Sequence, residues 1–391
     1  MRNLRKNLHF KYTRNSQRSE TTQSTPPNSP PFNSSFTMSL GQETPSTMKA
    51  LVTQADKTAI VEEIPVPEIA DDEVLIRTSA VALNPTDWKH IKGVTRPGTI
   101  AGVDFAGKIA RIGKNVTGLA IGDSVASFVH GGVYKDRGAF AQYVKTAGEL
   151  VWKIPDDSLT FEEAATMGCG LWTSVQALFH PGRLGLVEPP EKVFGEHWVF
   201  VYGGSSSVGL FAIDLAHLAG YKVVTVASPR NFDLVKSYGA DAVFDYKDPD
   251  VVEKIKEVTK DTVHHAFDTI SIESSQIISV KVLAAGPGKL VVVQSPATEA
   301  KFREDVPIIH TLIYTALGNE FHYGSTHHPA NAEDRGHMAK FLKKLPEFVT
   351  RKLVKPNPIK FWEGGLASIS DGLQFIQEGK NSGEKVVFKI E

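Results

Sequence analysis

Short apolar runs separated by turn residues fill the chain from residue 48 to about residue 160, and they predict strands rather than helices. MKALVTQ and TAIVEEIPVP are brief and cut by prolines, and VLIRTSAVAL alternates well enough for a half-buried strand. Closely spaced glycines between residues 93 and 122 predict tight turns. GDSVASFV and AFAQYVKT continue this pattern. We therefore expect a small, barrel-like all-β unit here.

Near residue 158 the spacing of the apolar residues changes from that of strands to that of helices. SLTFEEAATMGCGLWTSVQALF has helical apolar spacing, with N-cap candidates at Ser158 and Thr160, and predicts a long helix. After a loop rich in proline and glycine, strands such as HWVFVYGG and YKVVTVAS alternate with helices such as SVGLFAIDLAHLAG and NFDLVKSYGA, as far as the strand KLVVVQS. Strict alternation of strand and helix predicts a doubly wound parallel sheet with right-handed crossovers.

The last part of the chain returns to the first pattern. YTALGNEFHY, residues 314–323, predicts an edge strand after the parallel sheet, and MAKFLKKLPEFVTRKL predicts a helix before the closing strand EKVVFKIE. We therefore expect a tail over residues 1–47, a β domain over 48–162, a doubly wound nucleotide-binding domain over 163–325, and a return to the β domain over 326–391.

A glycine-rich turn, GGSSSVG, follows an apolar strand and opens a helix. Glycines permit the tight turn, and the first N–H groups of the helix attract a pyrophosphate, so this context predicts a dinucleotide site. Gly204 and Gly209 take the first and third glycine places of the G-x-G-x-x-G pattern, and Ser206 replaces the middle one. The residues expected to bind the cofactor here are Gly204, Ser205, Ser206, Ser207, Val208 and Gly209.

The second strand of this unit ends without the acidic residue that an NAD site uses to hold the ribose 2′-OH. Instead, Ser228 and Arg230 follow the strand, and a hydroxyl and a guanidinium suit a 2′-phosphate. Asn231 completes this segment, and Tyr246, after the third strand, is placed near the adenosine end. The sequence therefore predicts NADPH rather than NADH.

Composition narrows the choice of partners. A formal net charge of −1 gives no reason to expect nucleic acid or an anionic membrane as a partner. No apolar run approaches the roughly 20 residues that span a bilayer. The single cysteine, Cys169, excludes an internal disulfide and fits a reducing compartment.

The first 47 residues differ from the rest. TTQSTPPNSPPFNSS is rich in Ser, Thr, Pro and Asn and predicts disorder. The preceding residues are basic, without an acidic residue until Glu20, as in mitochondrial transit peptides. We prefer an extended start, with Met38 or Met48 as the true first residue, and a cytoplasmic location; mitochondrial import is the alternative.

The segment GVDFAGKIARIGKNV, residues 102–116, resembles the signature of zinc-dependent medium-chain alcohol dehydrogenases, in which His and Glu follow the first glycine. Here Val103 and Asp104 take those places, and valine cannot bind a metal. Cys169 lies far along the chain from Asn84, where the zinc enzymes carry a cysteine. Two pairs of adjacent histidines remain as possible metal ligands. His264 and His265 would point to opposite faces of a strand, and the pair at 327–328 is expected in a loop. We therefore expect no metal site.

Asn84-Pro85-Thr86-Asp87-Trp88-Lys89 is similar to the N-P-x-D-x-K segment of zinc-independent quinone and enoyl reductases. Together with GGSSSVG, SPRNFDLVKSYGA and FDYKDPD, it resembles most closely the fungal trans-acting enoyl reductases of polyketide pathways, in the medium-chain dehydrogenase/reductase superfamily. This resemblance implies an α/β fold with a GroES-like β-barrel domain and a Rossmann domain. It also implies a zinc-free, NADPH-dependent reduction of enoyl thioesters.

The resemblance also implies roles for individual residues. It makes Lys89 and Thr166 candidates for catalysis and for contact with the nicotinamide ribose or the substrate. Further cofactor contacts are implied for Thr86, Asp87, Lys89, Val293, Gln294, Lys385 and Val386. The expected substrate-lining residues are Gly170, Leu171, Trp172, Thr173 and Ser174. No His or Tyr acid stands out, so we expect water to deliver the proton.

Two alternative functions stay open. A quinone or enone reductase would use the same hydride chemistry with a different cavity. A non-catalytic NADPH-binding protein could keep the fold without turnover. The substrate is a small molecule or a carrier-bound acyl group, and both a monomer and a homodimer fit the sequence.

Overall fold

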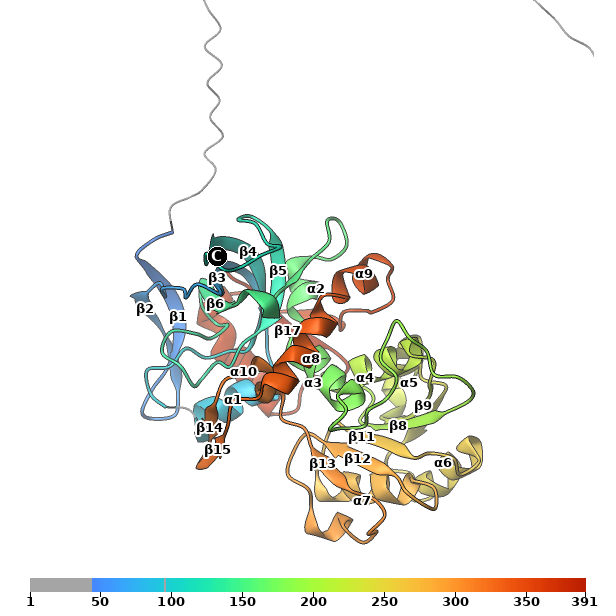
Figure 1. The fold of residues 1–391 in the computed structure, drawn as a ribbon. Coiled ribbons are helices and arrows are strands. Elements are labelled where there is room, and N and C mark those ends of the chain that lie inside the picture. The colour runs from blue at the N-terminus through green and yellow to red at the C-terminus, as the bar shows by residue number, and fades with distance from the viewer. Residues whose placement is uncertain (1–43, 95) are drawn as a thin grey trace, which may run out of the picture. The chain divides into compact units, whose positions relative to one another are not determined.

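The alternating second half of the chain forms a six-stranded parallel sheet in the computed structural model, which describes residues 44–94 and 96–391 (Figure 1). The strand order is β10-β9-β8-β11-β12-β13, and every neighbouring pair is parallel. This is the doubly wound order, in which the direction of winding reverses between the first and fourth strands, here β8 and β11. The strands are β8 (Trp198–Tyr202), β9 (Lys222–Ala227), β10 (Ala242–Asp245), β11 (His265–Asp268), β12 (Lys289–Val292) and β13 (Ile308–His310).

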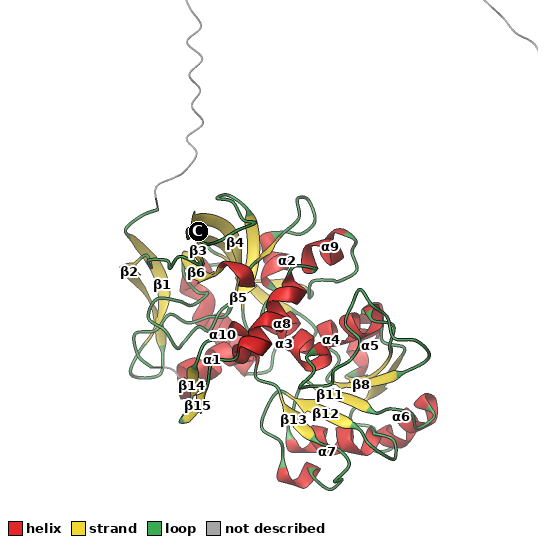
Figure 2. Ribbon diagram, viewed as in Figure 1, coloured by secondary structure: helices red, strands yellow, loops and turns green. Residues whose placement is uncertain are grey.

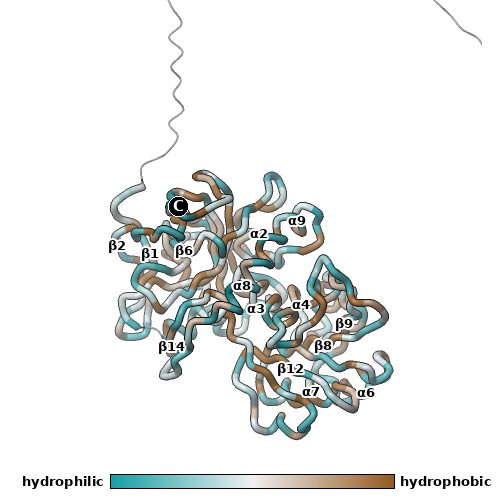
Figure 3. Tube along the Cα trace, viewed as in Figure 1, coloured by the Kyte–Doolittle hydropathy of each residue, from teal (hydrophilic) through white to brown (hydrophobic). Residues whose placement is uncertain are grey.

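Helices cover both faces of this sheet (Figures 1 and 2). They are α4 (Ser207–Leu218), α5 (Phe232–Ser237), α6 (Val251–Thr259) and α7 (Glu273–Val282). On α6, the buried residues Val251, Ile255 and Thr259 recur every four positions, so one stripe of the helix faces the sheet. Figure 3 shows the most hydrophobic segments running along the strands between these helices.

The β domain is built around one long strand, β3. It pairs antiparallel with β4, β6 and β17 in a mixed seven-stranded sheet, in which β16 runs parallel to β17, while β1 and β2 form a separate antiparallel pair. The strands are β1 (Thr47–Thr53), β2 (Ala59–Pro65), β3 (Glu73–Ala82), β4 (Asp104–Ile112), β5 (Ser124–Phe128), β6 (Tyr143–Ala147), β7 (Trp152–Lys153), β16 (Ile359–Phe361) and β17 (Lys385–Lys389). The predicted return of the chain therefore takes place through β16 and β17.

The remaining helical segments lie around the β domain and between the two sheets. The α-helices are α1 (Pro85–Lys89), α2 (Phe161–Ala165), α3 (Cys169–Phe179), α8 (Ala332–Leu342), α9 (Leu345–Thr350) and α10 (Ile369–Gln377). A π-helical turn covers His90–Val94, and the short 3-10 helices are Gly148–Leu150, Pro229–Asn231, Thr298–Ala300, Ile313–Leu317 and Gly365–Ser368. Helix α3 is almost entirely buried and packs against α4 and α8.

The long helix predicted over residues 158–179 is wrong, because the structure divides it into α2 and α3. Thr160 does cap α2, since its hydroxyl accepts from the Glu163 N–H at 3.2 Å. Gly168 then leaves helical geometry, and a Cβ there would lie 2.2 Å from Oδ1 of Asp104. The break brings the first N–H of α3 to this carboxylate, which no local pattern could reveal.

Three further predictions need correction. The helix predicted near residue 338 begins earlier, at Ala332, and is divided into α8 and α9, with Pro346 in the first turn of α9. Residues 314–323 are not an edge strand of the parallel sheet. They form a 3-10 helix, ended by Gly318 at a φ of +80°, and then β14 (Phe321–Tyr323), which pairs with β15 (Thr326–His328). The histidine pair at 327–328 therefore lies in a strand and not in a loop.

The predicted boundaries have mixed outcomes. Residues 1–43 of the predicted tail lie outside the described residues, while Ser46 already accepts a hydrogen bond from Val66 N at 3.0 Å and Thr47 begins β1. The first strand therefore starts slightly before residue 48. The boundaries at 162 and 325 stay predictions. In the described part of the chain, no helix is long and apolar enough to cross a membrane.

Candidate active site

A cleft of about 500 Å³ opens where β8 and β9 end, at the carboxyl edge of the parallel sheet. Doubly wound sheets bind their ligands at this edge, next to the reversal of strand order. One wall holds residues 205–207, Ser228 and Tyr246, and the opposite wall holds residues 83–85 and 381–386. The cleft is therefore built by both sheets together.

The glycine-rich turn has the tight geometry that the sequence predicts. Gly203 has a φ of +80°, and a Cβ on Gly204 would lie 2.2 Å from Oγ1 of Thr225. A Cβ on Gly209 would lie 2.2 Å from the carbonyl oxygen of Gly203. Ser206 caps α4, because its Oγ accepts from the Gly209 N–H at 2.9 Å. The N-terminus of a twelve-residue helix is thus held against the cleft.

The far end of the cleft carries small and polar side chains and no carboxylate directly after β9. Ser228, Asn231 and Tyr246 line it, while Arg230 is exposed beside it and is not among the lining residues. Asn231 also donates from Nδ2 to Ser382 Oγ at 3.1 Å, which ties the two walls together. Nearby, Lys247 Nζ lies 5.8 Å from the centroid of the Tyr246 ring.

A buried cluster of charges forms the opposite wall. Lys385 Nζ donates to Asn84 Oδ1 at 2.6 Å and to Asp104 Oδ2 at 3.0 Å, and Asn84 Nδ2 donates to the same carboxylate oxygen at 2.8 Å. Lys385 is only 3% exposed and Asp104 is 0% exposed. Because each charge is paired and hydrogen-bonded, the fold can hold both away from water. Lys385 still borders the cleft.

Two more acidic groups lie next to this cluster, although neither borders the cleft. The other Asp104 oxygen, Oδ1, accepts the Cys169 N–H at 2.6 Å. Burial raises the pKa of the Cys169 thiol, so the group stays protonated. Asp87 Oδ2 accepts the Asn84 N–H at 2.7 Å, and burial raises the pKa of Asp87 well above its usual range. Asp87 therefore positions Asn84 at the start of α1.

These residues do not fit a zinc ion. A zinc ion in a protein needs several ligands, which are thiolates, carboxylates or neutral histidines. Cysteine binds zinc as the thiolate. Here Asp104 is committed to Lys385, Cys169 is a thiol and Val103 is apolar. Within residues 44–94 and 96–391, no three His, Cys, Asp or Glu side chains are grouped to hold a metal. Cys169, far along the chain from Asn84, nevertheless has its backbone N–H bonded to Asp104.

Two family models match the sequence. The alcohol dehydrogenase GroES-like domain matches residues 70–156, and the zinc-binding dehydrogenase model matches residues 207–316. The trans-enoyl reductase ACTTS2 of Alternaria alternata is 40% identical over 349 residues, which cover 88% of this chain and 99% of the relative. The chain belongs to the trans-enoyl reductases of the medium-chain dehydrogenase/reductase superfamily. The protein is therefore an oxidoreductase. It has a GroES-like domain and a second domain that binds a nicotinamide cofactor, as the sequence predicted.

Solved structures agree with this fold of the reductase. The quinone oxidoreductase of Coxiella burnetii superposes with a TM-score of 0.67 at 23% identity, covering 88% of this chain and 100% of that one. A mycobacterial protein solved in complex with NADPH gives a TM-score of 0.68 at 20% identity, covering 88% and 99%. At these sequence identities the similarity shows only that the folds are alike.

The two predicted catalytic residues of the reductase lie in different settings. Lys89 ends α1, half-buried, with its Nζ 5.8 Å from the centroid of the Trp88 ring, and it does not border the cleft. Thr166 is 0% exposed, its hydroxyl donates to the Glu163 carbonyl at 2.7 Å, and it accepts from Asn357 N at 3.1 Å. The Thr166 hydroxyl is thus bonded within the fold, and the catalytic roles of both residues stay predictions.

The predicted substrate-lining residues form the buried start of α3 in the reductase. Leu171, Trp172 and Ser174 are 0% exposed, and Thr173 is 6% exposed. Gly170 allows α3 to approach α4, because a Cβ there would lie 2.6 Å from Ser207 Oγ. Helix α3 therefore supports the floor of the site, and the structure does not bring these side chains to the cleft.

Some of the remaining predicted cofactor contacts border the cleft, and others do not. Ser205, Ser206, Ser207, Lys385 and Val386 border the cleft. The predicted residues that do not border it are Thr86, Asp87, Gly204, Val208, Gly209, Val293 and Gln294. Gly204 and Gly209 act through the shape of the turn, as described above. Sequence reasoning missed the polar segment 381–384, whose only signal was the pair Ser382-Gly383 before the closing strand.

Proposed function

We propose that the protein is an NADPH-dependent reductase of activated C=C bonds that acts on enoyl thioesters. The observation that carries this proposal is the cleft, which joins a glycine-rich turn on one wall to the buried Lys385–Asp104–Asn84 cluster on the other. Support also comes from the 40% identity to a relative named trans-enoyl reductase. When bound, the nicotinamide supplies a hydride to the substrate's β carbon.

The residues of the chain bind and orient the two reactants. The N–H groups at the start of α4 attract the pyrophosphate, and the turn glycines let it approach the backbone. The Lys385 ammonium places a fixed positive charge at the wall of the cleft, where negative charge develops during reduction of an α,β-unsaturated thioester. Because Asp104 and Asn84 hold this charge in place, little reorganisation is needed when the substrate reacts.

The assay that tests this proposal compares substrates. We expect NADPH to be oxidised with a short enoyl-CoA thioester such as crotonyl-CoA, at a rate that a metal chelator leaves unchanged, since the Asp104 region does not fit a metal. A protein that reduces only quinones is a quinone reductase on this fold. A protein that binds NADPH in a 1:1 ratio and oxidises it with neither substrate is a non-catalytic binder. Loss of the rate with chelator would contradict zinc independence.

Selectivity for NADPH is a second expected result. Ser228 borders the cleft, Arg230 is exposed beside it, and no acidic residue directly follows β9 to repel a 2′-phosphate. A hydrogen bond to a charged group contributes about 1.5–3 kcal/mol, so Arg230→Ala is expected to reduce the NADPH-to-NADH ratio of kcat/KM by about 10- to 100-fold.

The control for this measurement is Arg351→Ala, which removes an exposed arginine, paired with Glu347 at 3.0 Å, at the end of α9. It should leave the ratio unchanged. Equal kcat/KM values for NADPH and NADH in the wild type would contradict the predicted cofactor.

A further inference from the structure

The polar segment 381–384 lies in the connection between α10 and β17 and forms part of one wall of the cleft (Figure 1). The glycine-rich turn and Ser228 lie on the opposite wall. This segment therefore brings residues of the β domain to a cofactor site that the sequence motifs assign to the parallel sheet alone.

Ser382 lies at the same end of the cleft as Ser228. Asn231 donates from Nδ2 to Ser382 Oγ at 3.1 Å, and its backbone N–H donates to the Ser228 carbonyl at 2.8 Å. A Cβ on the next residue, Gly383, would lie 2.7 Å from Leu234 Cδ2, so the segment packs closely against α5. Ser228 and Ser382 therefore border this end of the cleft from its two walls.

Three polar groups at this end have hydrogens to donate and no acceptor among the residues that the structure describes. Ser382 Oγ accepts from Asn231, but its own proton is not donated to a described residue. Within residues 44–94 and 96–391, the Ser228 hydroxyl and the Asn381 amide also make no hydrogen bond. All three side chains belong to residues that border the cleft. Such free donors favour a ligand group that carries several acceptor oxygens.

A 2′-phosphate is a group of this kind. A phosphate monoester carries about 1.5 to 2 negative charges at pH 7 and has three acceptor oxygens. NADH has a hydroxyl in its place, which a carboxylate accepts in sites that hold NADH. Glu384 is the one carboxylate of segment 381–384, and its Oε1 lies 3.7 Å from Lys360 Nζ, which offsets its charge. This end of the cleft therefore suits the phosphorylated coenzyme.

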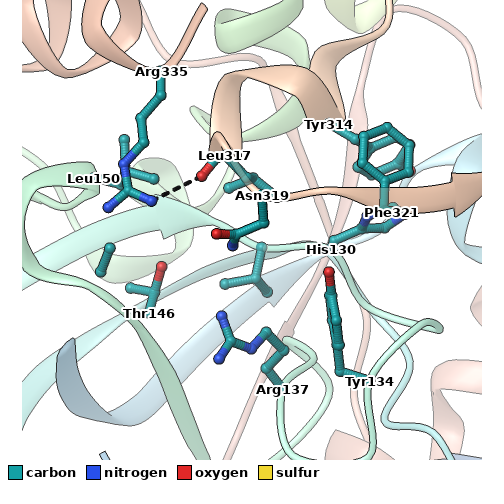
Figure 4. A pocket seen from close by; sticks show the side chains of 12 residues that line it. His130, Tyr134, Arg137, Thr146, Leu150, Tyr314, Leu317, Asn319, Phe321 and Arg335 are labelled. Carbon is teal, nitrogen blue, oxygen red and sulfur yellow. Dashed lines mark hydrogen bonds between the residues drawn. The ribbon is translucent and has the colours of Figure 1, made fainter. Parts of the chain in front are cut away.

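Two arginines that could hold a phosphate border a different pocket. Arg137 and Arg335 line a small pocket that shares no lining residue with the cleft (Figure 4). Its volume is about 20 Å³, which is enough for one water molecule. Arg137 is paired with Glu73 at 2.9 Å, and Arg335 is paired with Glu149 at 2.6 Å. The ribose phosphate of a coenzyme in the cleft must therefore be bound by residues at the end of the cleft itself.

We propose that Ser382 and Asn381 bind the 2′-phosphate of NADPH from the β domain, together with Ser228 on the opposite wall; this rests on the NADPH dependence of the proposed function. The Ser382 hydroxyl and the Asn381 amide donate to phosphate oxygens that NADH lacks. The phosphate then joins the two walls of the cleft, in addition to the hydrogen bond between Asn231 and Ser382. The choice of coenzyme therefore depends on both domains and not only on the segment after β9.

The test measures the Kd of the full chain for NADPH and for NADH by calorimetric titration. Ser382→Ala is expected to raise the Kd for NADPH by about 10- to 100-fold, as for the loss of a hydrogen bond to a charged group, and to leave the Kd for NADH within threefold. Asn381→Ala should change the two Kd values in the same way. The fragments 2′,5′-ADP and AMP differ by this phosphate alone and should show the same difference.

Ser370→Ala is the matched control, because Ser370 is an exposed serine of α10 that does not border the cleft. It should keep both Kd values, and thermal unfolding should show that all the variants are folded. A Ser382→Ala variant that keeps the wild-type Kd for NADPH, or that raises both Kd values by the same factor, overturns the proposed phosphate site. A wild type that binds 2′,5′-ADP more tightly than AMP but oxidises no NADPH with crotonyl-CoA overturns the proposed function and leaves this site standing.

Discussion

Lys385→Met is expected to destabilise the protein by about 3–5 kcal/mol and to weaken NADPH binding. The substitution leaves the Asp104 carboxylate 0% exposed without its cation, and removing one member of a buried ion pair costs about this much. It also removes the positive charge at the wall of the cleft. Denaturant-induced unfolding measures the first effect, and a fluorescence titration with NADPH measures the second.

Two further variants separate stability from binding. Lys360→Met removes a half-buried lysine from the neighbouring strand β16, whose Nζ is 3.7 Å from Glu384, and should cost less than about 1 kcal/mol. Combining Lys385→Met with Asp104→Asn removes the unpaired charge and should recover most of the stability, while NADPH binding stays weak. Equal stability of the two single Lys→Met variants would show that the buried pair does not have the proposed role.

Gly209→Ala is expected to raise the Kd for NADPH by about 10- to 100-fold and to destabilise the protein by about 1–3 kcal/mol. The added Cβ would lie 2.2 Å from the Gly203 carbonyl oxygen and 2.9 Å from the Gly204 Cα. Both are backbone atoms, so the whole turn must move, and with it the N–H groups that face the pyrophosphate. Calorimetric titration with NADPH measures the affinity.

Gly336→Ala makes the same substitution where there is room. Gly336 lies inside α8, and no atom lies within 4 Å of a Cβ added there. Since alanine favours helix more than glycine, this control should stabilise the protein by about 0.5–1 kcal/mol and leave the Kd unchanged. Unchanged NADPH affinity in Gly209→Ala would mean that the turn does not hold the cofactor.

Local patterns predicted the parts of this protein that local interactions determine. The parallel sheet follows from strands and helices in strict alternation, and the turn at Gly204 and Gly209 follows from glycines between a strand and a helix. Thr160 was recognisable as a helix cap because its partner, Glu163, is three residues away. In each case the relevant residues are neighbours in the sequence.

Non-local contacts explain what the sequence could not predict. The break between α2 and α3 depends on Asp104, 65 residues before Cys169. Thr166 seemed a candidate for catalysis, but a hydrogen bond from Asn357 at 3.1 Å commits its hydroxyl to the fold. Hydrophobic spacing carries no information about such pairs.

The pairing of β17 with β3 has a consequence for how the active site forms. Val387 lies opposite Ala82, so about 300 residues separate partners in one antiparallel ladder. Contacts of such long range form slowly, because the entropy of closing the loop is lost before the pairing is gained. The Rossmann strands are joined by far shorter connections and can pair first. Lys385, the first residue of β17, therefore reaches Asp104 only late in folding, and competence to hold the coenzyme is among the last properties the molecule acquires.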